Sequence, residues 1–248
     1  MENTSTNAEG RSRSLVTFVS TGPGNADFLT QESIGHLREA ERIYCFGTGQ
    51  NDGTASSRTL ETLRSLDATM VSRAVVVTLP MATQRTEAHA AYDRLTSQLC
   101  DDVKRGQRVA VCVEGSSNIY ASVRYVMERL TSLGIPYAET AGIPSFIAAA
   151  TAARLSLCEL QERLTVIPGT ITADEIETLI GQHTNLVVMK LSHCTAAIQT
   201  CIHRHPDFQY HYFENVGTPQ QFYTTDRQHL TSLVAFPYFS LMVIKPGR

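Results

Sequence analysis

The sequence lacks any apolar run long enough to span a bilayer as a helix. Its first 14 residues, MENTSTNAEGRSRS, are polar and lack the apolar segment of a secretory signal peptide. We therefore expect residues 1–14 to form a disordered tail. We also expect a cytoplasmic protein that has no membrane as a partner.

An excess of positive charge is also missing. The chain has 21 Lys and Arg residues against 24 Asp and Glu residues, which gives a formal net charge of −3. Because no basic field is available to attract phosphates, nucleic acid is not an expected partner. An anionic substrate would instead need a local cluster of Arg or Lys side chains.

Closely spaced cysteine pairs are absent as well. The six cysteines are Cys45, Cys100, Cys112, Cys158, Cys194 and Cys201. No two of them have CxxC spacing, so we expect free, buried thiols in a reducing compartment. His203 and His205 flank Arg204, but their i, i+2 spacing places them on different faces of a helix. We predict no protein-bound metal, since metal ligands must converge on one point.

The 248 residues, 42% of them apolar, suffice for one large or two small domains. Apolar runs predict strands at 15–19, 43–46, 74–79, 109–113, 137–140, 164–167, 186–191, 209–214, 221–225 and 238–245. Helical patterns cover 30–42, 58–66, 86–105, the stretch after 117 to 133, 145–154, 173–181 and 195–204, with a helical turn at 226–230. Strands that alternate with helices indicate an α/β fold.

Residues 15–30, LVTFVSTGPGNADFLT, open this pattern. A short apolar strand is followed by the turn Thr21–Gly24 and then by a helix. Strand, glycine-rich turn and helix form the first unit of an α/β nucleotide-type fold. Glycines suit this turn because the backbone must bend sharply and approach a ligand closely. A plain tight turn is the alternative explanation.

A second strand, loop and helix unit begins at Val109–Val113. This continuous apolar run predicts a strand that is covered on both faces, as in a parallel sheet. Ser116 and Ser117 are the expected N-cap residues of the helix that follows. Ligands of open α/β sheets bind at the carboxyl ends of the strands, so the loop is a candidate ligand site. A helix capped by serine without a ligand is the alternative.

The last part of the chain predicts strands without long helices between them, which favours antiparallel pairing. We therefore expect two domains. An N-terminal α/β domain over residues 15–134 would have a mostly parallel sheet, and a C-terminal α/β domain over residues 135–248 would have a mixed sheet. A ligand cleft is expected between the two.

Several motifs resemble those of the tetrapyrrole methylase family. The family opens with V-G-x-G-P-G-D-x-x-L-T, and this chain has VSTGPGNADFLT at 19–30. The family motif G-D-P-x-x-Y is similar to GSSNIY at 115–120, and P-G-I-S-S resembles AGIPS at 141–145. A later family strand that ends in Met resembles VMK at 188–190. The resemblance extends from about Leu15 to Lys245.

Three further stretches resemble one subfamily, the precorrin-2 C20-methyltransferases of cobalamin biosynthesis. They are LPM at 79–81 with polar TQR at 83–85, MKL at 189–191 and PYFSL at 237–241. Each stretch alone is a weak indicator, and it is their order and spacing that favour the subfamily.

Five positions depart from the family motifs. Ser20 replaces the first Gly and Asn25 replaces the Asp of the opening motif. Ser116 and Ser117 replace the Asp-Pro of the second motif, and Pro144 replaces a small polar residue. The change at Ser116 matters most if the carboxylate holds a cofactor, because charge-assisted hydrogen bonds are roughly twice as strong as neutral ones.

The resemblance implies S-adenosylmethionine (SAM) as the cofactor, bound in a cleft between the two halves. The matching cofactor positions are Pro23, Glu114, Gly115, Ser116, Ile119, Tyr120, Pro144, Ser145, Met189 and Gly217. A tetrapyrrole substrate is a polycarboxylate, and its candidate contacts are Arg85, Arg124 and Lys190. Glu114 and Glu214 are candidates for the proton acceptor, and neither is assigned. A homodimer is likewise implied.

The reaction that the resemblance implies is methylation of precorrin-2, or of cobalt-precorrin-2, at C20, which yields precorrin-3A from the cobalt-free substrate. Two alternatives remain open. One is another tetrapyrrole methyltransferase, and the other is a non-catalytic tetrapyrrole-binding member that has lost SAM.

Overall fold

The computed structural model describes residues 15–49, 55–79 and 85–247. The chain divides into two compact units, Met1–Pro144 and Ser145–Arg248, and each is described by itself. The expected tail at 1–14 lies outside the described residues. So does most of the LPM and TQR stretch, since residues 80–84 are not described.

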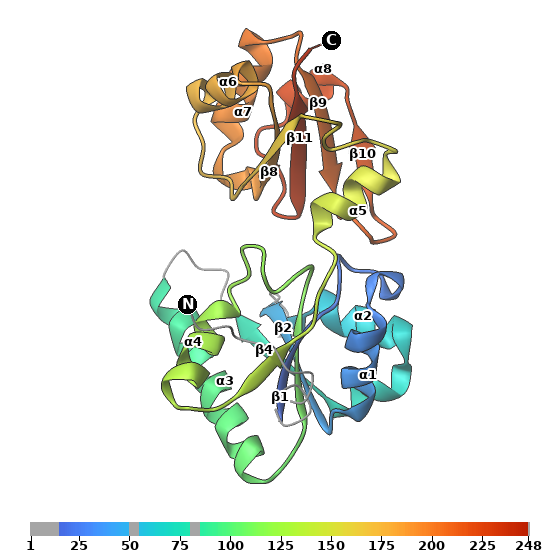
Figure 1. The fold of residues 1–248 in the computed structure, drawn as a ribbon, viewed down its shortest axis with the longest axis vertical. Coiled ribbons are helices and arrows are strands. Elements are labelled where there is room, and N and C mark those ends of the chain that lie inside the picture. The colour runs from blue at the N-terminus through green and yellow to red at the C-terminus, as the bar shows by residue number, and fades with distance from the viewer. Residues whose placement is uncertain (1–14, 50–54, 80–84, 248) are drawn as a thin grey trace. The chain divides into compact units, whose positions relative to one another are not determined.

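The first unit is a mostly parallel sheet with helices on both faces (Figure 1). Its strands are β1 (Val16–Ser20), β2 (Arg42–Gly49), β3 (Ala55–Ser56), β4 (Ala74–Leu79), β5 (Val109–Val113) and β6 (Tyr137–Glu139). β5 pairs with β2 and β1, β4 pairs with β2, and β6 pairs with β1, all in parallel, whereas the two-residue β3 is antiparallel to β2. The prediction of a mostly parallel sheet is therefore confirmed.

Two pairs of helices cover this sheet. Figure 1 shows α1 (Gln31–Glu39) and α2 (Arg58–Leu66) on one face, and α3 (Arg85–Lys104) and α4 (Arg124–Ser132) on the other. The 3-10 helices η2 (Ala26–Phe28) and η3 (Ala68–Arg73) precede α1 and follow α2. All five residues of β5 are buried, and they alternate between two cores: Val111 packs with the α3 and α4 side, and Cys112 with the α1 and α2 side. This confirms the strand covered on both faces.

The position of β6 moves the boundary between the units. Tyr137 and Glu139 are in register with Val16 and Phe18 of β1, so β6 is an edge strand of the first sheet. The division consequently falls after Pro144 rather than between residues 134 and 135.

The expected N-cap role of Ser116 and Ser117 is wrong. α4 begins only at Arg124, and its N-cap residue Val123 makes no side-chain cap. The Ser117 hydroxyl instead donates to Glu139 Oε2 at 2.9 Å. Residues 114–123 are therefore a loop, and its serines are available to organise that loop.

The second unit contains a mixed sheet. Its strands are β7 (Arg163–Ile167), β8 (Thr184–Met189), β9 (Gln209–Glu214), β10 (Phe222–Thr224) and β11 (Ser240–Lys245). Their order is β10-β9-β11-β8-β7. β7 and β8 are parallel and the other neighbours are antiparallel, which confirms the predicted mixed sheet and the antiparallel pairing late in the chain.

Helices complete this unit. They are α5 (Ser145–Ala152), α6 (Ala173–Gly181), α7 (Thr195–Arg204), α8 (Arg227–Ser232) and the 3-10 helix η4 (Leu191–His193). Ile176 of α6, Ile198 of α7 and Met242 of β11 share one core. α6 begins with a capping box: Thr172 Oγ1 accepts from the Glu175 amide, and Glu175 Oε2 accepts from the Thr172 amide.

All six cysteines are free, as expected, and four of them are buried. Cys158 is exposed, which differs from the expectation of buried thiols. Among the described residues, no group of three or more His, Cys, Asp or Glu side chains is arranged to hold a metal ion. No helix in the described part of the chain has the length and apolar character needed to cross a membrane.

Candidate functional site

The loops that follow β1 and β5 are joined through their glycines. The Gly22 amide donates to the Gly115 carbonyl at 3.1 Å, and the Gly115 amide donates back to the Gly22 carbonyl at 2.9 Å. The amide and the hydroxyl of Thr21 both donate to the Val113 carbonyl, at 2.9 and 3.1 Å. The opening glycine turn and the second glycine loop are thus one structure at the carboxyl edge of the sheet.

The loop after β6 packs tightly against both of them. A Cβ added to Gly142 would lie 2.3 Å from the Ser20 Cβ and 2.5 Å from the Gly115 carbonyl oxygen. Real Cβ atoms essentially never approach other atoms so closely. Glycine at 142 is therefore what allows the three loops to meet.

The backbone at this edge leaves room for a ligand. Gly22 and Gly115 have φ of 68° and 73°, and Tyr120 has φ of 49°, all in the left-handed region. Glycine adopts a positive φ without steric cost, so only Tyr120 is strained by it, at about 1–3 kcal/mol. Apart from its two chain neighbours, no described residue has an atom within 4 Å of the position that a Gly115 Cβ would occupy. The space beside the Gly115 Cα is therefore open.

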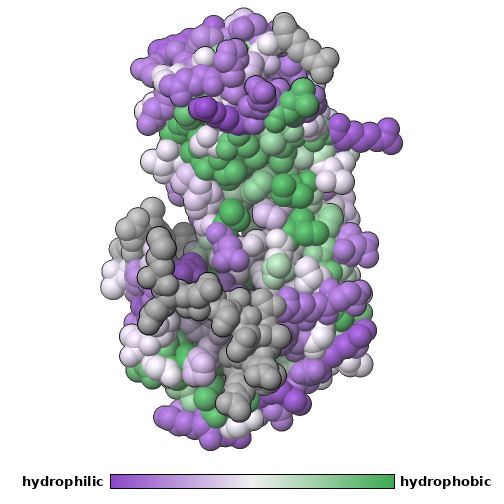
Figure 2. Space-filling model, in the orientation of Figure 1, coloured by the Kyte–Doolittle hydropathy of each residue, from purple (hydrophilic) through white to green (hydrophobic). Residues whose placement is uncertain are grey.

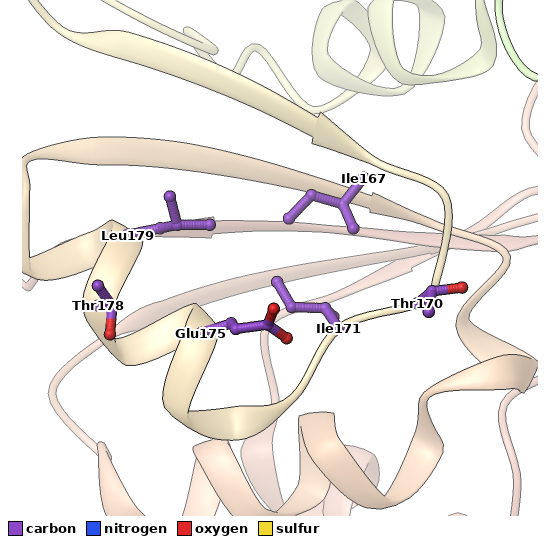
Figure 3. Close-up of a pocket in the computed structure, with 6 residues that line it drawn as sticks. All are labelled: Ile167, Thr170, Ile171, Glu175, Thr178 and Leu179. Atoms are coloured by element: carbon purple, nitrogen blue, oxygen red, sulfur yellow. The ribbon is translucent and has the colours of Figure 1, made fainter.

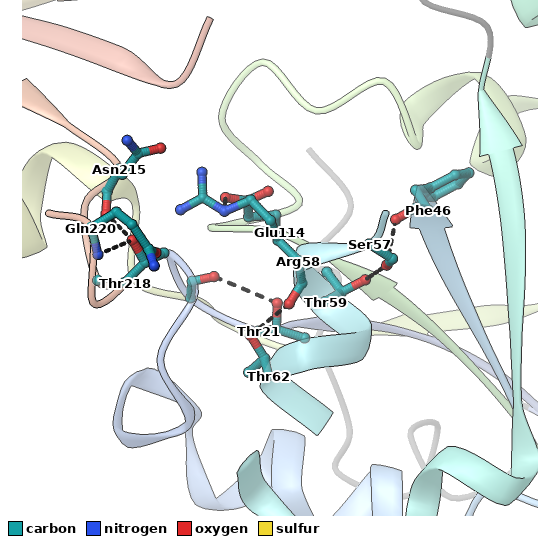
Figure 4. A network of polar contacts seen from close by, with 12 residues as sticks. Thr21, Phe46, Ser57, Arg58, Thr59, Thr62, Glu114, Asn215, Thr218 and Gln220 are labelled. Atoms are coloured by element: carbon teal, nitrogen blue, oxygen red, sulfur yellow. Dashed lines mark hydrogen bonds and ion pairs between the residues drawn. The ribbon is translucent and has the colours of Figure 1, made fainter. Parts of the chain in front are cut away.

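A carboxylate and a guanidinium also meet at this edge. Glu114 Oε1 lies 3.2 Å from Arg58 Nε, and Figure 4 shows the pair beside the start of α2. Arg58 is the first residue of α2, whose N-cap Ser57 accepts from the Leu60 amide and donates to the Phe46 carbonyl at 2.7 Å. Burial raises the pKa of Glu114, and the charge of Arg58 opposes that rise.

We expect Glu114→Gln to become more stable relative to the wild type as the pH rises. The pKa of Glu114 is raised in the folded state, so folding favours the protonated carboxyl. That contribution is present below the ordinary pKa of 4.5 and is lost as the pH rises through the folded-state pKa. Urea unfolding of both proteins between about pH 4 and 7 measures the difference. A difference that is constant with pH contradicts the raised pKa.

The candidate substrate contacts of the first unit are placed differently. Arg124 Nη1 lies 3.5 Å from Glu139 Oε1, and the Arg124 side chain is 51% exposed. It is therefore held by a carboxylate but remains accessible to an anion. Arg85 is the first residue of α3, and its side chain is not among the described ones.

Predicted cofactor residues and a candidate proton acceptor lie at one edge of the second sheet. β8 and β9 are both antiparallel to β11, so their carboxyl ends lie at the same edge. Met189 is in register with Leu241, and Glu214 with Ser240. The Tyr212 hydroxyl donates to Glu214 Oε1 at 2.6 Å, so this candidate proton acceptor is already bonded to a side chain.

The turns at this edge have left-handed backbone conformations and a close backbone contact. Lys190 has a left-handed φ of 56°, and a Cβ on Gly169 would lie 2.5 Å from the Lys190 carbonyl oxygen. Gly217 has φ of 80°, and its amide donates to Gln221 Oε1 at 2.8 Å. The strand ends that carry Met189 and Gly217 are thus fixed by backbone geometry.

The predicted cofactor residues fall into two sets. Those on the three linked loops of the first unit are Pro23, Glu114, Gly115, Ser116, Ile119, Tyr120 and Pro144. Those of the second unit are Ser145, at the start of α5, Met189, at the end of β8, and Gly217, in the turn after β9. Whether the two sets share one cleft stays a prediction.

Some residues that organise the three linked loops of the first unit are not evident from the sequence. Ser20 stood out only as a departure from the family motif, although its side chain links the loops. Arg58 gave no signal, because its partner Glu114 belongs to a distant strand end. Gly142 was visible within AGIPS, but its role depends on contacts that only the folded chain creates.

A separate hollow of about 360 Å³ lies against α6 (Figure 3). Its lining residues are Ile167, Thr170, Ile171, Glu175, Thr178 and Leu179. Glu175 is bonded within its capping box, and the Thr178 hydroxyl donates to the Asp174 carbonyl at 2.8 Å. None of the predicted ligand residues lines this hollow, so it is not assigned to the candidate site.

The fold and the linked loops define the class of the protein. It is an α/β protein of two units, in which two glycine-containing loops are bridged at the carboxyl edge of the first unit's parallel strands. The chain belongs to the tetrapyrrole (corrin/porphyrin) methylases, because the model of that family matches residues 15–231.

Two curated relatives are C(20)-methyltransferases of precorrin-2 or cobalt-precorrin-2. The cobalt-precorrin-2 C(20)-methyltransferase of Salmonella typhimurium is 26% identical over 176 residues, which are 70% of this chain and 71% of the relative. The precorrin-2 C(20)-methyltransferase of a Sinorhizobium species is 24% identical over 233 residues, which are 92% and 94% of the two chains.

Solved structures of the same fold cover almost the whole chain. A cobalt-precorrin-4 methyltransferase has a TM-score of 0.65 at 15% identity, with 93% of this chain and 94% of that chain covered. The uroporphyrin-III C-methyltransferase of Thermus thermophilus, complexed with S-adenosylhomocysteine, has a TM-score of 0.62 at 16% identity, with 93% and 91% covered. At these identities the likeness establishes the fold.

Proposed function

We propose that the protein is a SAM-dependent methyltransferase that methylates precorrin-2 or cobalt-precorrin-2 at C20. The observation that carries the proposal is the Gly22–Gly115 bridge, which joins the two motifs that resemble the family's glycine loops. The names of the two curated relatives support the choice of substrate and position.

The cofactor is proposed to contact the chain mainly through its backbone. In the first unit the contacts are Pro23, Gly115, Ser116, Ile119, Tyr120 and Pro144, and in the second they are Ser145, Met189 and Gly217. When bound, SAM supplies a methyl group that its sulfonium already activates. The protein therefore needs no covalent nucleophile, and its own residues have to align the reactants and exclude water.

Charged side chains are proposed to handle the substrate. Arg124 and Lys190, with Arg85, bind substrate carboxylates, for which cationic side chains are the natural partners. Glu114 accepts the proton that leaves the methylated carbon, since burial raises its pKa towards the range of a useful base. Arg58 holds the Glu114 carboxylate in place through the 3.2 Å ion pair.

Titration calorimetry with S-adenosylhomocysteine tests the cofactor part of the proposal. Binding in the micromolar range is expected. No binding at millimolar ligand contradicts it and favours a tetrapyrrole-binding member that has lost SAM. If binding is present, turnover across a panel of tetrapyrroles separates precorrin-2 from other precorrins and uroporphyrinogen.

We expect Ser116→Asp to tighten S-adenosylhomocysteine binding about fivefold. The substitution restores the carboxylate of the family motif, and hydrogen bonds to a charged group are roughly twice as strong as neutral ones. Ser116 is buried, and its hydroxyl accepts from the Asn118 amide only at 3.4 Å. Weaker calorimetric binding by the variant would show that the loop differs from the family's geometry. Asn118→Asp, two residues further along the loop and exposed, is the matched control.

A homodimer is proposed as the working form, in the cytoplasm. The second unit exposes large apolar side chains, and Figure 2 shows apolar surface over it. They include Phe222 (40%), Tyr223 (41%), Val234 (97%), Tyr238 (58%) and Phe239 (43%). Such surfaces commonly mark sites of protein association. Analytical ultracentrifugation is expected to give twice the mass of one chain, and a monomer contradicts the proposal.

A further inference from the structure

One buried hydroxyl links the three loops of the first unit. Ser20 and Ser117 are both fully buried. The Ser117 amide donates to Ser20 Oγ at 3.1 Å, and Ser20 Oγ donates to the Thr140 carbonyl at 2.9 Å. The Ser20 amide in turn donates to Thr140 Oγ1 at 3.0 Å. Ser20 therefore bonds to the loop after β5 and to the end of β6 at once.

The two serines replace a motif pair that could not make this bond. The family motifs have Gly where this chain has Ser20 and Pro where it has Ser117. Glycine has no side-chain acceptor, and proline has no amide hydrogen to donate. If the chain had Ser117 but kept the family's Gly at position 20, the buried Ser117 amide would lack this hydrogen-bond acceptor, at a cost in free energy. The two departures are thus complementary, because Ser20 supplies the acceptor and Ser117 supplies the donor of one hydrogen bond.

The hydroxyl of Ser117 fixes the same loop on another side. It donates to Glu139 Oε2 at 2.9 Å, while Glu139 Oε1 lies 3.5 Å from Arg124 Nη1. The start of the Gly115–Tyr120 loop is consequently held by its backbone amide at Ser20 and by its side chain at Glu139.

We infer that Ser20 is a positioning residue, which sets the Gly115–Tyr120 loop for the cofactor through its hydrogen bond to the Ser117 amide. The inference rests on the proposed function, since it concerns the same site. Ser20 lies outside the expected ligand set, and its pairing with Ser117 replaces the Gly and Pro of the family motif.

The test compares Ser20→Ala, Ser20→Gly and the double variant Ser20→Gly/Ser117→Pro by calorimetry with S-adenosylhomocysteine. Each single variant is expected to bind about tenfold more weakly than the wild type, because the Ser117 amide loses its partner. The double variant loses the Ser117 hydroxyl bond to Glu139 as well, so it is expected to bind no more tightly than Ser20→Gly alone. Hydrogen exchange without ligand is expected to be faster at Ser117 in both single variants.

Ser33→Ala is the matched control. Ser33 is fully buried, and its hydroxyl donates to the Ser20 carbonyl at 3.1 Å and lies 2.7 Å from Thr140 Oγ1. It supports β1 and β6 without a bond to the Gly115–Tyr120 loop among the described contacts. We expect it to lower the melting temperature while leaving the affinity for S-adenosylhomocysteine unchanged.

Each outcome is decisive. If the wild type binds and Ser20→Ala binds equally well, the inference is overturned while the proposed function stands. An equal loss of affinity in Ser33→Ala shows a merely structural effect and also overturns it. If the wild type does not bind, the proposed function fails and the positioning role fails with it. Unchanged exchange at Ser117 contradicts the hydrogen bond itself.

Discussion

Gly142→Ala is expected to lower the free energy of unfolding by about 3 kcal/mol and to abolish S-adenosylhomocysteine binding. The added Cβ would lie 2.3 Å from the Ser20 Cβ and 2.5 Å from the Gly115 carbonyl oxygen. Ser20 is fixed by its own strand, and Gly115 is fixed by its bridge to Gly22. Because neither atom is the end of a flexible side chain, the backbone of the linked loops has to move.

Urea unfolding and titration calorimetry measure the two effects. Gly35→Ala is the matched control in the same unit, since Gly35 is inside α1 and, beyond its chain neighbours and the adjacent backbone of that helix, no described atom lies within 4 Å of its added Cβ. That variant is expected to gain about 0.5–1 kcal/mol from better helix propensity and to bind normally. Wild-type stability and affinity in Gly142→Ala would contradict the close packing of the loops.

Asp102→Ala is the second substitution with a large expected effect, a loss of about 3 kcal/mol in the free energy of unfolding. The Asp102 side chain is 2% exposed. Its Oδ2 accepts from the Tyr44 hydroxyl at 2.7 Å, and its Oδ1 lies 3.4 Å from Arg42 Nη1 and 3.5 Å from Arg105 Nη1. Removal of the carboxylate leaves the buried Tyr44 hydroxyl without this acceptor and two cations without their counter-charge.

The neighbouring Asp101 provides the control. Its side chain is 60% exposed and lies 3.7 Å from Lys104 Nζ, so Asp101→Ala is expected to change stability by less than about 1 kcal/mol. Asp102 is near the end of α3, away from the carboxyl strand ends that carry the candidate site. The folded Asp102→Ala protein is therefore expected to keep its affinity for S-adenosylhomocysteine. Equal stability of the two variants would contradict the role of the buried carboxylate.

Local signals predicted the elements that form from contiguous residues. α2, β4, β5, α6, α7 and β9 have the predicted bounds, because apolar periodicity and caps such as Thr172 lie within each segment. β6 has only three residues, and its membership of the first sheet depends on pairing with β1. The boundary between the units followed from that long-range pairing, which no local pattern contains.

In the candidate site, too, some features follow from the local sequence and others depend on long-range contacts. The glycines at 22 and 115 are visible in the sequence, since a motif and a left-handed turn both require them. The polar side chains that organise the loops depend on partners from other strands. Ser117 was assigned as an N-cap from its residue type, yet its amide bonds to Ser20 and its hydroxyl to Glu139. Side-chain chemistry predicted hydrogen bonds there, but only the fold determines the partners.

The proposed reaction is the transfer of a methyl group to C20 of precorrin-2 or its cobalt form. The most direct measurement incubates the purified protein with SAM and either substrate, beside a competent control enzyme, and follows the product by mass spectrometry and NMR. The expected product is heavier than the substrate by one methyl group, and that group is on C20. No such product from either substrate, in assays where the control enzyme turns over, would contradict it.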